Sequence, residues 1–208
     1  MATEALILVD IQNDFLPGGA LAVPEGDAVI PVVNRLQSGF DIVVASQDWH
    51  PADHLSFASQ HEAMTPFEVT EVDGLTQILW PDHCVQYSHG AEFAPDLNMG
   101  RVDAVFRKGT DRRIDSYSAF HDNGHRNTTG LADWLRARDV TAVTLAGLAA
   151  DVCVYFTAMD AVNEGFATRL VSDGTRGVDL QPGDVDSAFE RMRAAGVEIV
   201  TSERLAGH

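Results

Sequence analysis

Short apolar runs rich in branched residues recur along the chain, separated by polar segments. Six of them are predicted to be strands: LILV (6–9), DIVVAS (41–46), AVF (104–106), VTLA (143–146), ATRLV (167–171) and VEIV (197–200). Their apolar positions are nearly continuous instead of alternating with polar ones. This pattern is typical of strands buried on both faces of a parallel sheet.

Helical spacing of apolar residues appears in three segments between these runs. The segments cover residues 29–36, 152–159 and 185–192. Each follows an acidic residue that is predicted to cap the helix: Asp27, Asp151 and Asp184. Each stops before a glycine: Gly39, Gly165 and Gly196. The alternation of strands and helices predicts an α/β fold, with a doubly wound, mostly parallel six-stranded sheet and helices on both faces.

A long segment at about residues 47–103 interrupts this alternation. It carries five of the eight histidines, His50, His54, His61, His83 and His89. Long irregular segments inside a compact domain usually have a function. We therefore expect a single domain over residues 1–208, with an active-site insertion at about 47–103.

Composition narrows the function classes. The net charge of −17 argues against binding of nucleic acid or an anionic membrane through a general basic surface. The first apolar run is too short for a signal peptide or a membrane span, so a cytoplasmic location is expected, with Cys84 and Cys153 both reduced. A homo-oligomer is compatible with the sequence, which does not determine the oligomeric state.

Ionisable residues follow several of the predicted strands, where parallel α/β sheets bind their ligands. Asp10, Lys108 and Cys153 each lie at or shortly after the end of an apolar run. A thiol nucleophile needs a base and a neighbouring cation, and Asp10 and Lys108 can supply them. Taken singly, each residue also has an ordinary structural explanation: a turn aspartate, a surface lysine and a packed cysteine. Their joint placement favours a nucleophilic triad without histidine.

A metal site is predicted in the histidine-rich segment. SQDWHPADH offers Asp48, His50 and His54, and WPDHC adds His83. In an extended stretch Asp48 and His50 face the same side, and two imidazoles with one carboxylate leave coordination positions open. Zinc, iron and manganese all suit such ligands, and the alternative is a histidine-rich loop without metal. The other histidines are expected at the surface: His61, His89, His121, His125 and His208.

Together these motifs resemble a known family. They are DIQNDF (10–15), PGGALAV (17–23), SQDWHPADHLSFAS (46–59), WPDHCVQ (80–86), FRKG (106–109), DSYSAF (115–120) and GLAADVCV (147–154). In this order, over about residues 4–200, the set resembles the nicotinamidases of the isochorismatase-like cysteine hydrolase family. The pairing of DWHPxxH with WPDHC separates nicotinamidases from isochorismatases, which lack the metal site.

The resemblance implies an amidohydrolase that converts nicotinamide to nicotinate and ammonia through a thioester on Cys153. The reaction belongs to NAD salvage, a part of pyridine nucleotide biosynthesis, and pyrazinamide is expected as a second substrate. Asp10 would be the base and Lys108 its cationic partner. One divalent metal ion, zinc by expectation and iron or manganese as alternatives, would bind Asp48, His50 and His83, while His54 is a ligand in some members only.

The resemblance also implies details of the pocket. The N–H groups of Ala149 and Cys153 would form an oxyanion hole, next to a cis peptide bond between Leu148 and Ala149. Substrate contacts would come from Phe15, Trp80, Leu148 and Tyr117. Some members carry a polar residue where this chain has Val152, and we expect that side chain to point away from the substrate.

Two other functions remain open on sequence grounds. Another small-amide or ureido hydrolase of this fold, or an isochorismatase, would keep Asp10, Lys108 and Cys153 but would not need the metal ligands. A noncatalytic metal- or ligand-binding module would have an unreactive thiol. Ammonia release from a panel of amides distinguishes a nicotinamidase from the other hydrolases of this fold. Alkylation of Cys153 distinguishes an enzyme with a reactive thiol from a noncatalytic binding module.

Overall fold

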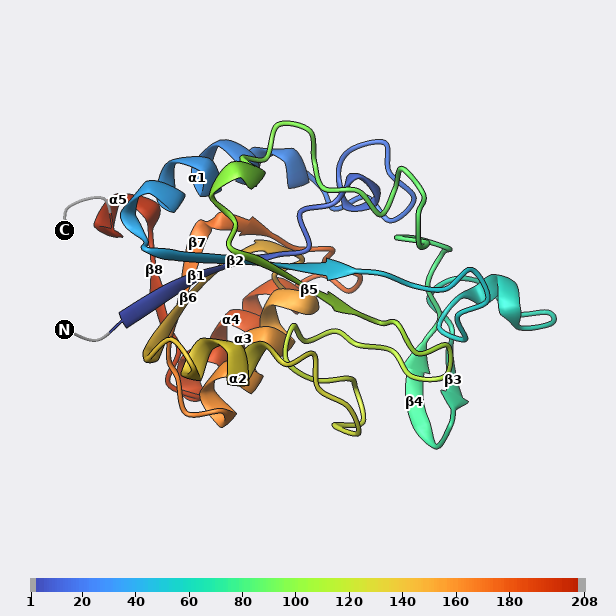
Figure 1. Ribbon diagram of the computed structural model, residues 1–208. Helices are drawn as coiled ribbons and strands as arrows, with labels where there is room; N and C mark the ends of the chain where they lie inside the picture. The colour runs from blue at the N-terminus through green and yellow to red at the C-terminus, as the bar shows by residue number, and fades with distance from the viewer. Residues whose placement is uncertain (1–2, 206–208) are drawn as a thin grey trace.

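All six predicted runs form one parallel sheet in the computed structural model, which describes residues 3–205. The strand order is β5-β2-β1-β6-β7-β8, and every neighbouring pair is parallel. The bounds are β1 (Thr3–Val9), β2 (Ile42–Asp48), β5 (Ala104–Lys108), β6 (Val140–Leu148), β7 (Ala167–Arg176) and β8 (Glu198–Val200). The predicted α/β sheet is therefore confirmed (Figure 1).

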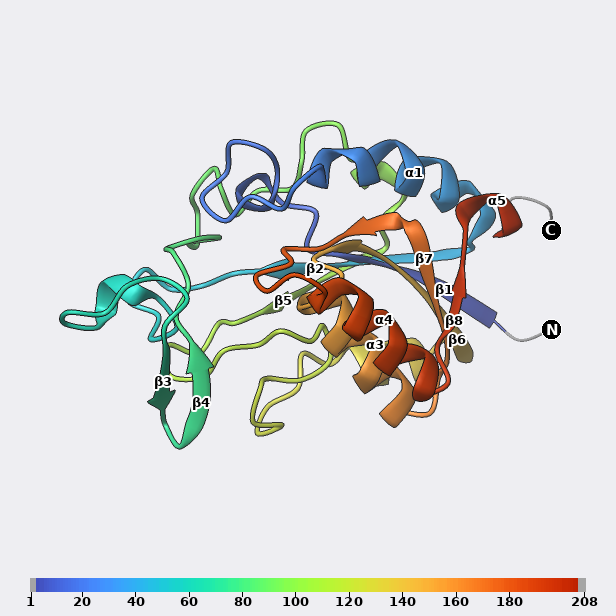
Figure 2. The same cartoon turned by 180° about the vertical axis from the view of Figure 1, so that it is seen from behind.

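Helices cover both faces of the sheet (Figures 1 and 2). One face carries α1 (Val29–Leu36) and α5 (Ser202–Leu205); the other carries α2 (Leu131–Arg136), α3 (Cys153–Asn163) and α4 (Asp184–Ala194). Leu6 and Leu8 of β1 belong to the core under α1, whereas Ile7 and Val9 belong to the core under α3. Successive strand residues point to opposite faces, so a strand covered on both sides must be apolar at every position.

The three predicted acidic caps are wrong. The N-cap residues are Ala28, Val152 and Gly183, and none of them makes a side-chain capping hydrogen bond. The Asp151 carboxylate instead accepts the N–H groups of Val178 and Asp179, at 2.9 and 2.7 Å. These partners lie in the loop after β7, so a long-range contact replaces the local cap.

The segment between β2 and β5 adds no strand to the sheet, and the structure describes it throughout. It contains an antiparallel hairpin of β3 (Val69–Val72) and β4 (Leu75–Ile78), which lies beyond the carboxyl ends of the sheet strands (Figure 1). Short 3-10 turns complete the chain: η1 (Asn13–Phe15), η2 (Gly26–Ala28), η3 (Gln37–Gly39), η4 (Ala58–Gln60) and η5 (Met99–Arg101). The hairpin was not predicted from the sequence.

The strand order places a ligand crevice at the ends of β1 and β6. From β1 the chain continues to β2 on one side, while β6 lies on the other side. Such a reversal opens a crevice outside the carboxyl ends of the two strands. Gly147 allows their close approach, because its φ is +130° and a Cβ there would lie 2.1 Å from the Val9 carbonyl oxygen. Asp10 and the turn that leads to Cys153 both begin at this crevice.

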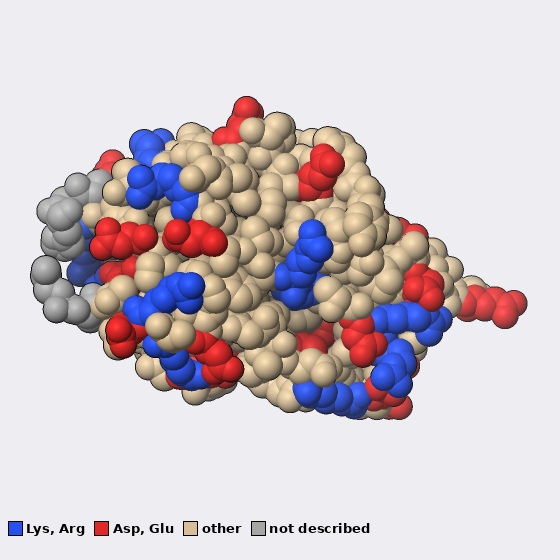
Figure 3. Space-filling view, viewed as in Figure 1, with Lys and Arg blue, Asp and Glu red and all other residues tan. Residues whose placement is uncertain are grey.

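Charged side chains of both signs are interspersed on the face drawn in Figure 3. Many of them lie toward the two ends of that face, while a basic side chain lies near its centre and acidic side chains lie along its upper part. Over residues 3–205, no helix has the length and apolar character needed to cross a membrane.

Candidate active site

Lys108 is the centre of a buried network of charges. It ends β5 in register with Asp48, the last residue of β2. Its Nζ lies 2.9 Å from Asp10 Oδ2, 3.0 Å from Asp48 Oδ1 and 3.6 Å from Cys153 Sγ, and it donates to the Ser116 carbonyl at 2.8 Å. The structure therefore brings the three residues of the predicted triad together, although they are far apart in the sequence.

Burial and charge set the protonation states of this network. Burial raises the pKa of Asp10, against the pull of Lys108. Burial also raises the pKa of the Cys153 thiol well above its usual value, with Lys108 lowering it and Asp10 raising it. Burial alone would lower the pKa of Lys108, but the Asp10 and Asp48 carboxylates raise it well above its usual value. The lysine is therefore charged, while the thiol is protonated at rest.

Proton transfer from Cys153 to Asp10 leaves the net charge around Lys108 unchanged, because a thiolate replaces a carboxylate. Asp10 Oδ1 accepts the Ser46 hydroxyl at 2.7 Å. Asp10 Oδ2 is buried and receives no aligned hydrogen bond from any residue in the described range, although it is paired by charge with Lys108. That oxygen can therefore accept the thiol proton. Because the net charge around Lys108 does not change, this transfer creates no unpaired charge in the buried site.

Cys153 is the first residue of α3, where the helix dipole favours an anion. The peptide bond between Leu148 and Ala149 is cis, as the resemblance implies. The Ala149 carbonyl accepts the N–H groups of Val152 and Val154, whereas the N–H groups of Ala149 and Cys153 donate to no acceptor within residues 3–205. Two unused donors next to a thiol suit the oxyanion of an acyl-transfer reaction.

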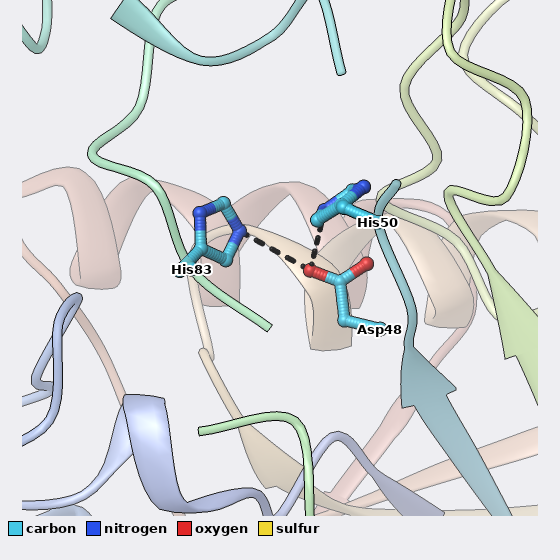
Figure 4. Close-up of side chains that lie close together, drawn as sticks. All are labelled: Asp48, His50 and His83. Atoms are coloured by element: carbon cyan, nitrogen blue, oxygen red, sulfur yellow. Dashed lines mark hydrogen bonds and ion pairs between the residues drawn. The ribbon is translucent and has the colours of Figure 1, made fainter. Parts of the chain in front are cut away.

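Asp48, His50 and His83 form the second half of the site (Figure 4). Asp48 Oδ2 lies 2.9 Å from His50 Nε2 and 3.2 Å from His83 Nε2. The Nδ1 atoms of the two rings lie 2.9 Å from the Gly109 carbonyl oxygen and 2.7 Å from the Pro81 carbonyl oxygen. Since a carbonyl can only accept, each Nδ1 donates its proton to that carbonyl, and each ring turns its Nε2 toward Asp48 Oδ2.

Three electron-pair donors that converge in a buried space require a cation between them, either protons or a metal ion. Burial alone would raise the pKa of Asp48, but His50 and Lys108 lower it well below its usual range. Asp48 in turn raises the pKa of His50, against the effect of burial. Two imidazole nitrogens and one carboxylate are a donor set that fits a divalent metal ion with open coordination positions.

His54 lies next to this triad but not within it. Its ring centroid is 4.4 Å from that of His50, and its ligand atoms group with His50 and Asp115. Ser56 N–H donates to His54 Nδ1 at 3.2 Å. Burial and the charge of His50 lower the pKa of His54 to about 4, so the ring is neutral. Direct metal binding by His54 stays a prediction.

The remaining histidines lie apart from the metal-ligating groups. His89 and His125 are exposed, and His61 and His121 are half-buried. None of these four belongs to a cluster of three or more metal-ligating groups within the part of the chain that the structure describes. His208 lies outside the described residues.

One cavity joins the thiol to the metal-ligating triad. Its lining comprises Phe15, Leu21, Val23, Asp48, Trp80, His83, Asp115, Tyr117, Ala149, Val152, Cys153 and Val178. Leu148 is fully buried in the apolar core and does not line this cavity. Val152 does line it, contrary to our expectation, because it occupies the non-helical N-cap position of α3 (φ −123°, ψ −98°).

Sequence reasoning missed several lining residues. Leu21 and Val23 could have been singled out, because they lie within the PGGALAV motif, whereas Val178 lies in a loop that no local pattern marks. Asp115 could have been singled out, because it opens the DSYSAF motif. Its carboxylate accepts the Gln77 side-chain amide at 2.9 Å, and Gln77 carries no signal in the sequence.

Comparison with known proteins agrees with this geometry. The isochorismatase domain matches residues 4–204. A nicotinamidase from Escherichia coli (strain K12) is 52% identical over 205 residues, which cover 97% of this chain and 96% of that protein. The structure of an Acinetobacter baumanii nicotinamidase/pyrazinamidase has a TM-score of 0.95 and 45% identity, and covers 99% of both chains.

Two further solved structures carry ligands. A protein from L. infantum in complex with nicotinate has a TM-score of 0.84 and 38% identity, covering 97% of this chain and 94% of its own. A pyrazinamidase from Pyrococcus horikoshii in complex with zinc has a TM-score of 0.77 and 39% identity, covering 95% and 98%. The chain described here therefore belongs to the isochorismatase family, in the branch that contains the nicotinamidases.

Proposed function

We propose that this chain is a nicotinamidase, which hydrolyses nicotinamide to nicotinate and ammonia in NAD salvage. The observation that carries the proposal is the single cavity that connects Cys153 to the ligands Asp48 and His83, between aromatic walls. An aromatic amide can place its carboxamide at the thiol and its ring nitrogen toward the metal-ligating side. The similarity to nicotinamidases over nearly the whole chain supports the same reaction.

The chemistry of the chain's own residues follows from the network around Lys108. Asp10 takes the proton of Cys153, and the thiolate attacks the amide carbonyl while Lys108 holds the local charge. The N–H groups of Ala149 and Cys153 stabilise the oxyanion, a contribution of about 3 kcal/mol for a donor of this kind. Asp10 returns the proton to the leaving ammonia, and a thioester remains on Cys153. Water then attacks the thioester and releases nicotinate.

Asp48, His50 and His83 would hold a divalent metal ion, which we propose to be zinc, with iron and manganese as alternatives. When bound, the ion supplies a Lewis-acidic contact that orients the pyridine ring and polarises water. Zinc is supported by the donor set and by the zinc complex of the related pyrazinamidase. His54 is proposed as an additional ligand or as a partner of a coordinated water.

Phe15, Trp80 and Tyr117 would contact the flat faces and edges of the pyridine ring. Pyrazinamide has nearly the same shape, so we propose it as a second substrate. Val152 and the other apolar lining residues leave little polar surface to interact with substituents on the ring.

The test measures ammonia and nicotinate release from nicotinamide, with and without a chelator, beside a panel of carbamoyl and ureido compounds. Nicotinamide should be the preferred substrate, and chelation should abolish turnover. Cys153→Ala should lose turnover but still bind nicotinate, while Cys84→Ala, the matched control, should stay active. Preferred hydrolysis of a ureido compound, or substantial activity in Cys153→Ala, would contradict the proposal.

Three further proposals come from the sequence. Residues 1–208 would form a single isochorismatase-like hydrolase domain with its active-site insertion at about 47–103. The enzyme would act in the cytoplasm on a small molecule, without nucleic acid or membrane as a partner. Self-association into a homo-oligomer can be tested by light scattering.

A further inference from the structure

The hairpin β3–β4 contacts two residues that line the substrate cavity, Asp115 and Tyr117, through one buried side chain. The hairpin pairs with no strand of the six-stranded sheet, and it lies apart from the body of that sheet (Figures 1 and 2). A two-stranded hairpin has little stability of its own. Gln77 is the one buried residue of β4, with only 4% of its surface exposed. A buried amide must find hydrogen-bond partners, so its contacts show what the hairpin is attached to.

The Gln77 amide binds two groups that line the cavity. Its Nε2 lies 2.9 Å from Asp115 Oδ2 and 3.3 Å from Tyr117 Oη, and also 2.6 Å from the Ile78 carbonyl oxygen. Asp115 and Tyr117 come from the loop after β5. This amide therefore joins the hairpin to a loop that lies 38 to 40 residues further along the chain. An apolar residue at position 77 would leave the carboxylate and the hydroxyl without this donor.

The Tyr117 hydroxyl is held from a second side by Trp80. The indole Nε1 donates to Tyr117 Oη at 3.2 Å, and the two rings meet edge to face with centroids 6.1 Å apart. Phe67, just before β3, packs its ring edge to face against Trp80 in turn, at 6.1 Å. Both aromatic rings of this cavity wall are thus supported from the hairpin side.

We propose that Gln77 is a positioning residue for substrate binding, which holds Tyr117 and Asp115 in the orientation that nicotinamide requires. This inference rests on the proposed function. Gln77 does not line the cavity and acts only through residues that do. Its loss should therefore weaken binding of the ring while leaving the network of Asp10, Lys108 and Cys153 unchanged.

The test is the kinetics of Gln77→Met, which keeps the length of the side chain and removes both amide donors. KM for nicotinamide should rise about fivefold to twentyfold while kcat stays within about threefold. The metal content should equal that of the wild type. Gln37→Met is the matched control, because Gln37 is a fully buried glutamine far from the cavity whose amide donates to Asn34. It should lower the thermal midpoint without changing KM.

Coupling to Tyr117 distinguishes positioning from general stability. Tyr117→Phe removes the hydroxyl, so Gln77→Met should raise KM much less in a Tyr117→Phe background than in the wild type. If the rises in KM caused by Gln77→Met and Tyr117→Phe simply multiply in the double variant, the two residues act independently and the inference is overturned. A wild-type KM in Gln77→Met would overturn it as well. If Gln77→Met does not fold, Gln77→Asn, which keeps the amide but shortens its reach, should show the same rise in KM. A wild-type enzyme that releases no ammonia from nicotinamide would instead refute the proposed function itself.

Discussion

Asp48 and Lys108 end neighbouring strands in register, and their side chains form a buried ion pair of 3.0 Å. The other oxygen of Asp48 faces the imidazoles of His50 and His83, and the same ammonium group faces Asp10 and Cys153. One pair of residues thus joins the candidate metal ligands to the candidate nucleophile. The sheet itself sets this geometry, because both residues are the last of their strands.

Lys108→Met should therefore damage both stability and catalysis. It leaves the Asp10 and Asp48 carboxylates buried without their shared cation, which should cost about 3–5 kcal/mol of the free energy of unfolding. We expect kcat/KM for nicotinamide to fall at least about 10²–10³-fold. Urea denaturation and steady-state kinetics measure the two effects. Arg107→Met is the control, since Arg107 is exposed and stacks on Trp49, and an equal loss in both variants would contradict the network.

Gly109→Ala should weaken metal binding although it replaces none of the proposed ligands. Gly109 has a φ of +64°, and a Cβ there would lie 2.3 Å from His50 Cε1 and 2.6 Å from His50 Nδ1. The ring would have to leave the Gly109 carbonyl that orients it, and we expect metal affinity to fall about 10–100-fold. Metal titration of the chelator-treated protein measures this.

Gly165→Ala provides the matched control for that variant. Gly165 has a φ of +86°, yet an added Cβ would meet no atom within 4 Å. The backbone strain is therefore comparable, while the contact with His50 is missing. Equal metal affinity in the two variants would show that His50 does not depend on Gly109.

The sequence predicts the charged residues at the strand ends of this site better than the residues that line its cavity. Buried strands such as β1 must be apolar at every position, and the charged residues that follow them must lie at the same edge of the sheet. Asp10, Lys108 and Cys153 could therefore be placed together from the pattern alone. The cap predicted at Asp151 failed because Asp151 finds partners 27 and 28 residues away, which no local rule anticipates.

Gln77 shows the same limit inside the site. Its partners Asp115 and Tyr117 lie 38 and 40 residues further along the chain, beyond an irregular segment. Nothing in LTQI distinguishes this glutamine from one on a solvent-exposed strand. The prediction that the Val152 side chain points away from the substrate was wrong for a geometric reason. The direction of this side chain depends on the backbone angles of Val152 itself, at the N-cap of α3.

Metal removal should destabilise the protein in a way that depends on His83. A metal ion that binds only the folded state raises the thermal midpoint by mass action, so a chelator should lower that of the wild type. His83→Ala removes one of the three proposed ligands and should make the midpoint insensitive to the chelator. His89→Ala, which removes an exposed imidazole, should respond like the wild type. A chelator effect of equal size in His83→Ala would place the stabilising ion elsewhere.

Glu164 should make a pH-dependent contribution to stability, remote from the active site. The hydrogen bond from His121 lowers the pKa of Glu164 below the usual value of 4.5, burial opposes this, and Arg136 adds to the lowering. A depressed carboxyl pKa stabilises the fold above the unfolded-state value, and the gain disappears as pH falls through the folded-state value. Glu164→Gln should thus lower the thermal midpoint by about 1–3 °C near neutral pH, and the difference from wild type should shrink as pH falls below 4.5 and vanish once pH is below the folded-state pKa of Glu164. Glu190→Gln, at an exposed position of α4, is the control and should show no such trend. If the difference between wild type and Glu164→Gln persists in acid, the Glu164 side chain stabilises the fold through packing and not through its charge.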